Sequence, residues 1–488
     1  MEPIDRRTAL ILGGAGLLSM STGAVGLWQS RSPALIEPLT GLNWQEPEVL
    51  RSEAGTLTVR LEAAAGSHRV AGRQVTTLGY NGGLPGPTLQ VRPGDTLRIE
   101  LVNRLAEPTN LHVHGLHVSP QGNGDNVFVS VAAGKSFTYE HQLPRDHPPG
   151  VFWYHPHHHG NVADQVFGGL YGAIIVEDDE DLPVSRERVM VVSDITLDES
   201  GKVRAPSRMA QMSGREGDLV LVNGQAAPAL QARPGQRERW RVINACSSRY
   251  LALSLNGAVL ERLGRDVGPL APPGPEGDLV LAPGNRADLV VTTRTEAGTA
   301  ILRAEPYDRG GMGSMMGGNA SSDEGPIDLI VMEVSGAPQS ALASLPRTTT
   351  PRDLRERRVS RSRVLTLEMG MGSAMMGAGG GMGFTIDGRP FDAKRVDQDV
   401  TAGAIEDWTI RNNSSMAHPF HLHVWPMQVL TRDAQTLAEP VWRDVVDVPA
   451  RSEVTVRIAF DDYTGSTVYH CHILDHEDRG MMGVIDVS

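Results

Sequence analysis

The run Tyr469-His470-Cys471-His472 places one thiol between two imidazoles. Successive side chains of a strand point to opposite faces, so a strand here would turn Cys471 one way and both histidines the other. One Cys, two His and a weak axial Met are the ligands of a blue-copper electron-transfer centre. His476 and Met481 follow on what should be a returning loop. The segment therefore predicts a copper site directly beside a second metal site.

A second segment offers the histidine that the copper site still lacks. It reads His418-Pro419-Phe420-His421-Leu422-His423, and strand alternation would turn His418 away from the other two histidines. The chain holds four His-x-His pairs: His112/His114, His155/His157, His421/His423 and His470/His472. One such pair would be weak, because zinc uses similar ligands. Four pairs beside the cysteine site predict a cluster of three metal ions with positions left open for oxygen.

Short strands in an internal repeat would position these residues. A turn followed by an alternating strand occurs three times, and each copy is followed by a second turn and strand. Frequent Gly and Pro, with almost no helical periodicity, predict an all-β chain of tandem Greek-key β-sandwiches. We predict an export signal over residues 1–31, domains over residues 41–180, 183–337 and 363–488, and a linker over residues 338–362.

The repeat also predicts which domain carries which metal. His155-Pro156-His157 in the first domain aligns with His470-Cys471-His472, and Pro156 replaces the thiolate. The second domain has Glu305-Pro306-Tyr307-Asp308-Arg309 at this place, with no histidine. The sequence therefore predicts one blue-copper site, in the third domain, and no copper in the second.

Charge and the first residues bear on location and partners. A net charge of −13 over 488 residues argues against binding to nucleic acid or to an anionic membrane. Arg6-Arg7 precede the uncharged apolar run from Ala9 to Leu27, which is typical of a twin-arginine export signal, with an uncleaved anchor as the alternative. We expect a monomer that is periplasmic, secreted or on the cell surface, without a membrane span in the mature chain.

The four histidine motifs and the cysteine segment resemble those of the three-domain multicopper oxidases, which include laccases and copper-efflux oxidases. The resemblance implies cupredoxin-like domains and four copper ions: one type 1, one type 2 and two type 3. It implies one-electron oxidation of a substrate, coupled to four-electron reduction of O2 to water. Type 1 copper would be held by His418, Cys471, His476 and Met481, type 2 by His112 and His421, and the type 3 pair by His114, His155, His157, His423, His470 and His472.

The resemblance also implies two carboxyl groups that supply protons near the cluster. Glu477 follows His476 directly and matches a position that the family uses. Asp125, eleven residues after His114, matches another, although its loop is two residues longer than in the copper-efflux members. Alternatively, either acid merely anchors its loop.

Methionines in glycine-rich stretches suggest the substrate. Thioethers select Cu(I), and Met416, two residues before His418, matches a position used by cuprous oxidases. Ser414 stands where those proteins carry an acid. We expect oxidation of Cu(I) in copper detoxification, with laccase-type oxidation of phenols and aromatic amines as the alternative. The candidate Cu(I) residues are Met416, Met369, Met371, Met375, Met376 and Met382.

Three other classes of protein fit less well. A copper-storage protein would need the methionines but no intact cluster, and a non-catalytic scaffold would have lost ligands. Copper nitrite reductases place blue copper in the first domain, where Pro156 excludes it. A blue colour that bleaches with reductant and returns in air would separate an oxidase from a copper binder.

Overall fold

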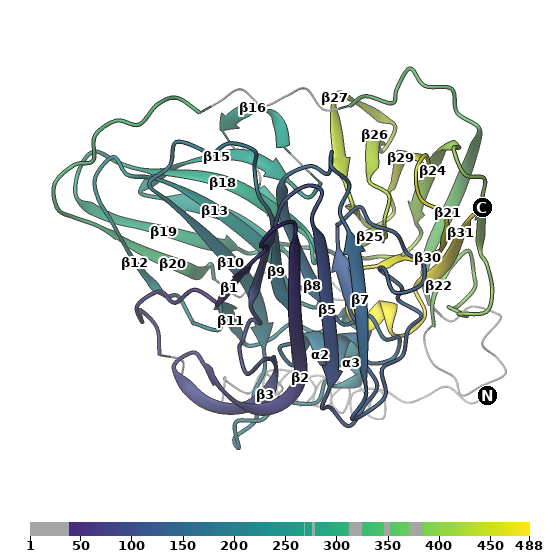
Figure 1. Cartoon of the computed structure of the whole chain (residues 1–488), viewed down its shortest axis with the longest axis horizontal. Coiled ribbons are helices and arrows are strands. Elements are labelled where there is room, and N and C mark those ends of the chain that lie inside the picture. The colour runs from purple at the N-terminus through teal and green to yellow at the C-terminus, as the bar shows by residue number, and fades with distance from the viewer. Residues whose placement is uncertain (1–38, 268, 276–278, 312–324, 346–351, 371–382) are drawn as a thin grey trace, which may run out of the picture.

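The computed structural model describes residues 39–267, 269–275, 279–311, 325–345, 352–370 and 383–488. Its strands form six sheets, and the sheets pair into three sandwiches that follow one another along the chain. The prediction of an all-β fold with three tandem cupredoxin-like sandwiches is confirmed. In the view of Figure 1 the second sandwich, in teal, lies to the left of the first and the third, in green and yellow, to its right.

The first sandwich packs a five-stranded sheet on a four-stranded one around Leu61, Ile99 and Tyr154. The five-stranded sheet contains, in spatial order, β1 (Val49–Arg51), β4 (Thr88–Val91), β9 (Gly172–Val176), β8 (Gly150–His155) and β6 (His112–His114). The other contains β3 (Arg73–Tyr80), β2 (Thr56–Val70), β5 (Thr96–Asn103) and β7 (Ser136–Gln142).

The second sandwich has its core around Trp240, Leu289 and Leu302. Its six-stranded sheet contains, in spatial order, β11 (Leu219–Val222), β10 (Arg186–Ile195), β13 (Arg237–Asn244), β18 (Arg286–Thr293), β15 (Ala258–Arg265) and β16 (Pro269–Pro275). Its five-stranded sheet contains β12 (Ala229–Ala232), β20 (Ile327–Val334), β19 (Gly298–Glu305), β14 (Leu251–Asn256) and β17 (Leu279–Leu281).

The third sandwich has its core around Trp408, Phe420 and Cys471. Its six-stranded sheet contains, in spatial order, β22 (Gly383–Ile386), β21 (Arg361–Gly370), β24 (Ile405–Asn412), β29 (Glu453–Ala459), β26 (Met427–Arg432) and β27 (Gln435–Arg443). Its five-stranded sheet contains β23 (Gln398–Val400), β31 (Met482–Val487), β30 (Gly465–Cys471), β25 (His418–Leu422) and β28 (Val445–Val448).

The internal repeat corresponds to one strand pair in each sandwich. The first turn and strand of each copy correspond to β5, β13 or β24. The second turn and strand correspond to β7, β18 or β29. Each first strand pairs antiparallel with its second. In β5, Leu97 and Ile99 are buried while Arg98 and Glu100 face solvent, as alternation requires. The repeat therefore predicted one antiparallel strand pair in every sandwich, which is central in the second and third sandwiches and at the sheet edge in the first.

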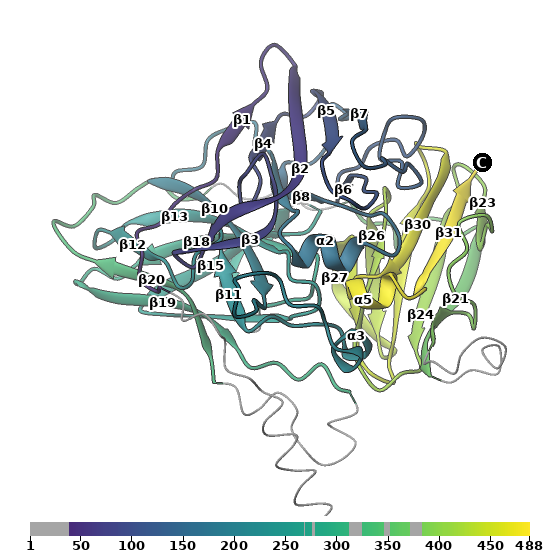
Figure 2. The ribbon, with the colours of Figure 1, turned by 90° about the horizontal axis from the view of Figure 1, so that it is seen from below.

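Among the described residues, three short helices gather where the sandwiches meet: α2 (Val162–Phe167), α3 (Arg208–Ser213) and α5 (Leu474–Glu477). In Figure 2, α5 lies between α2 and α3. One apolar cluster joins Trp153 of the first sandwich, Ile243 of the second and Leu474 of the third. The junction is thus a packed core, so α5 has a fixed place between the three sandwiches.

Two segments differ from the predicted domain limits. Thr40 and Asn43 form isolated β-bridges to Ala226 and Ala229. The segment before β1 therefore packs against the second sandwich, although it precedes the first in the sequence. The third sandwich begins inside the predicted linker, because β21 starts at Arg361 and Leu354 packs under Ile405. Leu354 is an apolar residue among charged ones, and burying it drives this packing.

Several predictions fall outside the described residues: the export signal over residues 1–31 and the methionines Met371, Met375, Met376 and Met382. Within the part of the chain that the structure describes, no helix is long and apolar enough to cross a bilayer.

Candidate metal centres

The cysteine site is built from two paired strands and α5. Phe420 of β25 lies opposite Cys471 of β30. The Cys471 Sγ atom lies 3.4 Å from His418 Nδ1 and 3.8 Å from His476 Nδ1. Met481 is buried beside them, and its carbonyl accepts a hydrogen bond from the Cys471 amide. The four residues predicted for type 1 copper therefore lie together.

Both histidines of this site are held by their far nitrogens. His418 Nε2 lies 2.8 Å from Ser414 Oγ, and His476 Nε2 donates to the Met212 carbonyl at 3.1 Å. The two Nδ1 atoms are thereby turned towards the sulfur. Burial lowers the pKa of His418 to about 3 and raises the pKa of the Cys471 thiol. Neutral imidazoles around a buried thiol suit a copper ion, which would stabilise the thiolate that burial alone disfavours.

The eight cluster histidines come from two matching strand pairs. In the first sandwich His112 of β6 lies opposite His155 of β8, and in the third His421 of β25 lies opposite His470 of β30. Both ladders place their His-x-His pairs at the end of the strand. The first and third sandwiches thus present equivalent edges to each other, which explains why each supplies four histidines.

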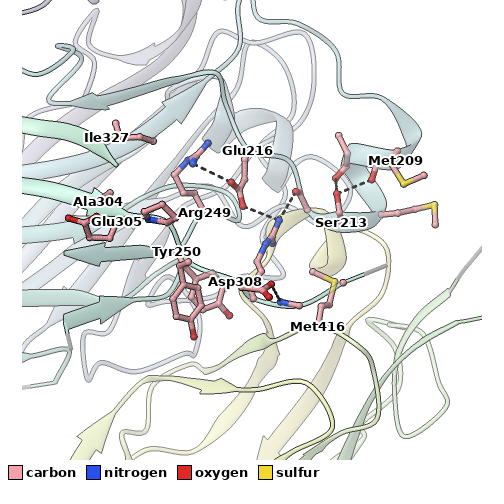
Figure 3. A pocket seen from close by; sticks show the side chains of 18 of the residues that line it. Met209, Ser213, Glu216, Arg249, Tyr250, Ala304, Glu305, Asp308, Ile327 and Met416 are labelled. Carbon is pink, nitrogen blue, oxygen red and sulfur yellow. Dashed lines mark hydrogen bonds and ion pairs between the residues drawn. The ribbon is translucent and has the colours of Figure 1, made fainter. Parts of the chain in front are cut away.

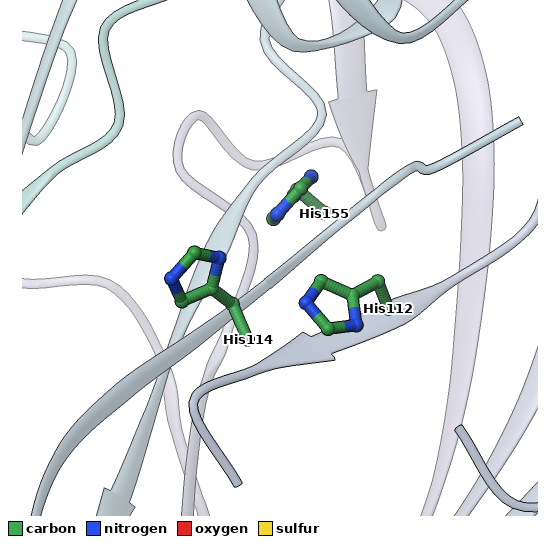
Figure 4. Close-up of side chains that lie close together, drawn as sticks. All are labelled: His112, His114 and His155. Atoms are coloured by element: carbon green, nitrogen blue, oxygen red, sulfur yellow. The ribbon is translucent and has the colours of Figure 1, made fainter. Parts of the chain in front are cut away.

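The two edges meet ring to ring. His112 stacks on His423 with ring centroids 3.8 Å apart, and His114 stacks on His421 at 4.0 Å. His112, His114 and His155 lie close together beside β6 (Figure 4). All eight rings are at most 2% exposed. The eight rings are therefore shielded from solvent between the first and third sandwiches, and we refer to the space that they surround as the chamber.

The ring nitrogens face one another in a way that calls for cations. His421 and His470 donate from Nδ1 to the carbonyls of Asp444 and Cys471, so their Nε2 atoms carry lone pairs. His421 Nε2 lies 3.4 Å from His112 Nε2, and His470 Nε2 lies 3.1 Å from His157 Nε2. Burial, together with the neighbouring imidazoles, lowers the pKa of His112 and that of His421. Neutral imidazoles with inward lone pairs fit metal ions.

Unpartnered nitrogens mark the rest of the chamber. Within the part of the chain that the structure describes, both ring nitrogens of His114 and of His472 are buried without a hydrogen-bond partner, as is Nε2 of His155. The centroid of His472 lies 4.9 Å from that of His114 and 5.6 Å from that of His155. Buried polar atoms normally have partners, so these three rings form a second set of nitrogens that could bind a metal ion. The residues present thus fit the copper ions that the sequence predicts.

The histidines approach one another in overlapping groups. His112 and His421, predicted for type 2 copper, face each other with their Nε2 atoms 3.4 Å apart. His157, His423 and His470, all predicted for the type 3 pair, converge within ligand distance of one another. His112 also converges with His114 and His155, and with His421 and His423. The assignment of single histidines to type 2 or type 3 copper therefore stays a prediction.

Asp125 lies against the cluster. Both its carboxylate oxygens are 2.9 Å from His112 Nδ1, and Oδ1 accepts from the Val113 amide. Oδ2 lies 3.7 Å from His423 Nδ1. Burial raises the pKa of Asp125 to about 7. The longer loop therefore still brings this acid to the histidines.

Glu477 reaches the cluster from α5. Its Oε2 atom lies 3.0 Å from His470 Nδ1, and Oε1 lies 3.5 Å from His157 Nε2. Burial raises the pKa of this fully buried carboxyl to about 7. Because His476 and Glu477 are adjacent, one helical turn joins the cysteine site to the cluster.

A third carboxyl group at the cluster was missed by the sequence analysis. Asp444 Oδ2 lies 3.9 Å from His114 Nε2, and Asp444 forms a possible metal-binding group with His114 and His421. The available signal was its position directly before β28, the strand that pairs with β25. No spacing motif contains Asp444, so only the strand register reveals it.

A pocket of about 370 Å³ lies beside the cysteine site, between the second and third sandwiches. Four methionines line it, of which Met416 and Met369 were predicted and Met209 and Met212, on α3, were not (Figure 3). Glu216, which also lines the pocket, forms ion pairs with Arg249 at 3.3 Å and with Arg309 at 3.0 Å. The pocket therefore combines soft sulfur atoms with a charged, hydrogen-bonded wall.

Known proteins of the same build define the class. Residues 63–181 and 361–488 match family models described as multicopper oxidase. A multicopper oxidase of Staphylococcus aureus is 31% identical, with 84% of each chain covered. The laccase of Bacillus subtilis is 28% identical over 84% of this chain and 90% of its own. A solved multicopper oxidase of Campylobacter jejuni, titled a metallo-oxidase, has a TM-score of 0.80 and 29% identity, covering 92% of this chain and 95% of its own.

The chain belongs to the multicopper oxidases, and its architecture is that of the three-domain members. It is an oxidoreductase of a laccase-like family whose members use O2 and a reducing substrate. Copper is the cofactor that this family implies, and the buried His and Cys groups are the places in the chain that fit it.

Proposed function

We propose that this chain is a cuprous oxidase that acts in copper detoxification. The reaction balances as four Cu(I), one O2 and four protons, giving four Cu(II) and two waters. Oxidation would convert the more toxic, thioether-seeking ion into Cu(II), which prefers nitrogen and oxygen ligands.

The observation that carries this proposal is the methionine wall of the pocket. Met416 is buried two residues before His418, and the Met212 carbonyl accepts from His476. Met369 is partly buried and packs against the third core. A Cu(I) ion that enters the pocket would meet thioethers next to both histidines of the cysteine site, and thioethers select Cu(I).

We further propose four resident copper ions, one at the cysteine site and three among the eight histidines. When bound, these ions would supply the one-electron steps and the binding of O2. The chain's own part is to hold the two sites close: Cys471 belongs to one site, and its neighbours His470 and His472 belong to the other. Only a few covalent bonds separate the two sites.

Asp125 and Glu477 would give the chamber its protons. Each is buried, and each lies within about hydrogen-bond reach of a cluster histidine: Asp125 at 2.9 Å and Glu477 at 3.0 Å. Because both carboxyl groups adjoin the cluster directly, each could pass a proton into the chamber without an intervening residue.

Oxidation of phenols and aromatic amines is the second candidate function. Tyr250 and Tyr307 stack with centroids 5.0 Å apart and line the same pocket. An aromatic substrate could pack on this pair, while Glu216 and the two arginines would bind its polar groups. Both substrates would deliver electrons at the same end of the molecule.

Oxygen uptake with Cu(I) and with a phenol separates these functions. We expect M416L and M212L to lose Cu(I) oxidation while they keep phenol oxidation, because leucine retains volume and removes the sulfur. M332L, in the core of the second sandwich, is the control. Deletion of residues 369 to 382 provides a second test, and loss of phenol turnover with Cu(I) turnover intact would overturn the cuprous proposal.

We also propose that the chain is exported by the twin-arginine route and acts in the periplasm or at the cell surface. Arg6-Arg7 and the uncharged apolar run that follows support this. Export of a folded protein suits a molecule whose metal sites require several segments at once.

A further inference from the structure

Arg286 is a buried cation that binds all three sandwiches. It begins β18 of the second sandwich and is 0% exposed. Its Nε atom donates to the Val151 carbonyl of the first sandwich at 3.0 Å, and Nη1 donates to Asp444 Oδ1 of the third at 2.6 Å. Asp266 of its own sandwich lies 3.6 Å from Nη1. A buried charge with this many partners is fixed in position.

Asp444 connects this cation to the histidine cluster. Its backbone carbonyl accepts from His421 Nδ1 at 2.8 Å, which leaves Nε2 of that ring facing His112. Its Oδ1 atom is held by Arg286, while Oδ2 has no hydrogen-bond partner among the described residues and lies 3.9 Å from His114 Nε2. One residue therefore touches a histidine from each of the two ligand-bearing sandwiches.

Two glycines allow this close approach. A Cβ atom on Gly115 would lie 2.3 Å from Arg286 Nη2 and 2.4 Å from Asp444 Oδ2. A Cβ atom on Gly284 would lie about 2.9 Å from the ring of His472. Both glycines have positive φ angles. The second sandwich, which supplies no histidine, thus reaches the chamber through Gly284 and Arg286.

We propose that Arg286 and Asp444 are positioning residues for the histidine cluster. Arg286 fixes Asp444; the Asp444 carbonyl sets the orientation of His421, and its free carboxylate oxygen faces His114. Partners of this kind fix the ring orientation and the tautomer of a metal-binding histidine. This inference rests on the proposed function in one respect, namely that the histidines hold copper.

The test compares R286M and D444N with the wild type in the copper-loaded, full-length protein. We expect both variants to keep the intense blue absorption of the cysteine site and to weaken or lose the type 2 copper signal in electron paramagnetic resonance. Oxygen reduction should fall roughly 10- to 100-fold. R286K, which keeps a cation beside Asp444, should retain more of the type 2 signal than R286M.

R239M is the matched control. Arg239 of β13 is 3% exposed and forms a buried ion pair with Asp288 of β18. Its other ion-pair partners in the described part of the chain are Asp178 and Glu187, both carboxylates. If R239M lost the type 2 signal as fully as R286M at an equal drop in melting temperature, the pair would have only a general structural role, and the inference would be overturned.

The double variant R286M/D444N guards against a variant that fails to fold, because it removes both buried charges together. A folded double variant with a wild-type type 2 signal and wild-type oxygen reduction would overturn the inference. The wild type tests the proposed function separately: without blue colour and type 2 signal after copper loading, the proposed function itself would fail, and this inference with it.

Discussion

Arg215 of the second sandwich binds both carboxylate oxygens of Asp475, the residue that precedes His476. Its Nε atom lies 3.1 and 3.0 Å from the two oxygens, and Nη2 lies 2.7 Å from Oδ1. On the far side of α5, Asp478 accepts from the amides of Gly160 and Ala163 in the first sandwich. The turn that carries His476 and Glu477 is therefore held from two sandwiches.

Substitution R215M should destabilise the protein and disturb the cysteine site. Removing one partner of a buried ion pair costs about 3–5 kcal/mol, and Asp475 would remain buried without its cation. Thermal unfolding and the blue absorption band measure the two effects. D164N is the control, because the Asp164 side chain that also meets Arg215 is 68% exposed, so its loss should cost at most about 1 kcal/mol.

Substitution C471S should abolish the blue colour and oxidase turnover. Serine lacks the soft sulfur ligand, whereas the eight cluster histidines remain in place. Visible absorption, oxygen uptake and the type 2 copper signal are the measurements, and only the last should persist. A blue C471S protein would show that another residue supplies the thiolate.

Substitution E477Q should slow oxygen reduction about 100-fold, the usual contribution of a positioned proton donor. Bleaching of the blue colour by reductant without oxygen should proceed at the wild-type rate, because that step needs no proton at the cluster. E453Q serves as control, because Glu453 is an exposed carboxylate on β29.

We expect D125N to behave like E477Q. Unchanged oxygen reduction in D125N would mean that Asp125 only anchors its loop.

His117 and Asp462 join the first and third sandwiches by a pair that responds to pH. Burial lowers the pKa of His117, but the hydrogen bond and charge of Asp462 outweigh burial and leave this pKa raised. Burial raises the pKa of Asp462, and here too the partner prevails, so that the pKa is lowered. Both shifts favour the ion pair.

The pair should therefore stabilise the fold most between pH 3.8 and 6.5, the ordinary pKa values of its two groups. Its contribution should decline as pH rises through the raised pKa of His117, and also as pH falls through the lowered pKa of Asp462. Since both side chains are partly exposed, its size should be at most about 1 kcal/mol. A double-mutant cycle of H117Q and D462N across this pH range measures it; a coupling energy independent of pH would contradict the prediction.

Replacing both arginines, R6K and R7K, should leave the protein in the cytoplasm if the twin-arginine route exports it. Fractionation of cells that produce the variant, with the wild type beside it, provides the measurement. Normal export of the doubly substituted chain would contradict the proposed route.

The sequence predicted those features that depend on strand alternation. His-x-His places two rings on one face, and Cys471 between two histidines faces the other way, so a period of two already separates the cysteine site from the cluster. The repeat likewise located β5, β13 and β24, because each keeps its turn and its alternating apolar residues, although β13 is buried on both faces.

Features that depend on contacts between sandwiches were not predictable in this way. Arg286 and Asp444 are 158 residues apart, and although Arg286 begins a strand of the repeat, no spacing in the sequence links the two residues. Met212 reaches His476 from α3, a short helix in the second sandwich with no counterpart in the repeat. Such contacts follow from how three separate cores dock on one another, and a single sequence carries no periodic signal for that docking.

The chamber between the first and third sandwiches also fixes when copper can be loaded. His157 and His470 meet across 313 residues of chain. While the protein emerges from the ribosome, the first sandwich can fold with its four histidines exposed on an unfinished edge. The eight histidines cannot come together until synthesis has passed His472. If they hold copper as proposed, metal insertion at this cluster has to follow synthesis of the third sandwich.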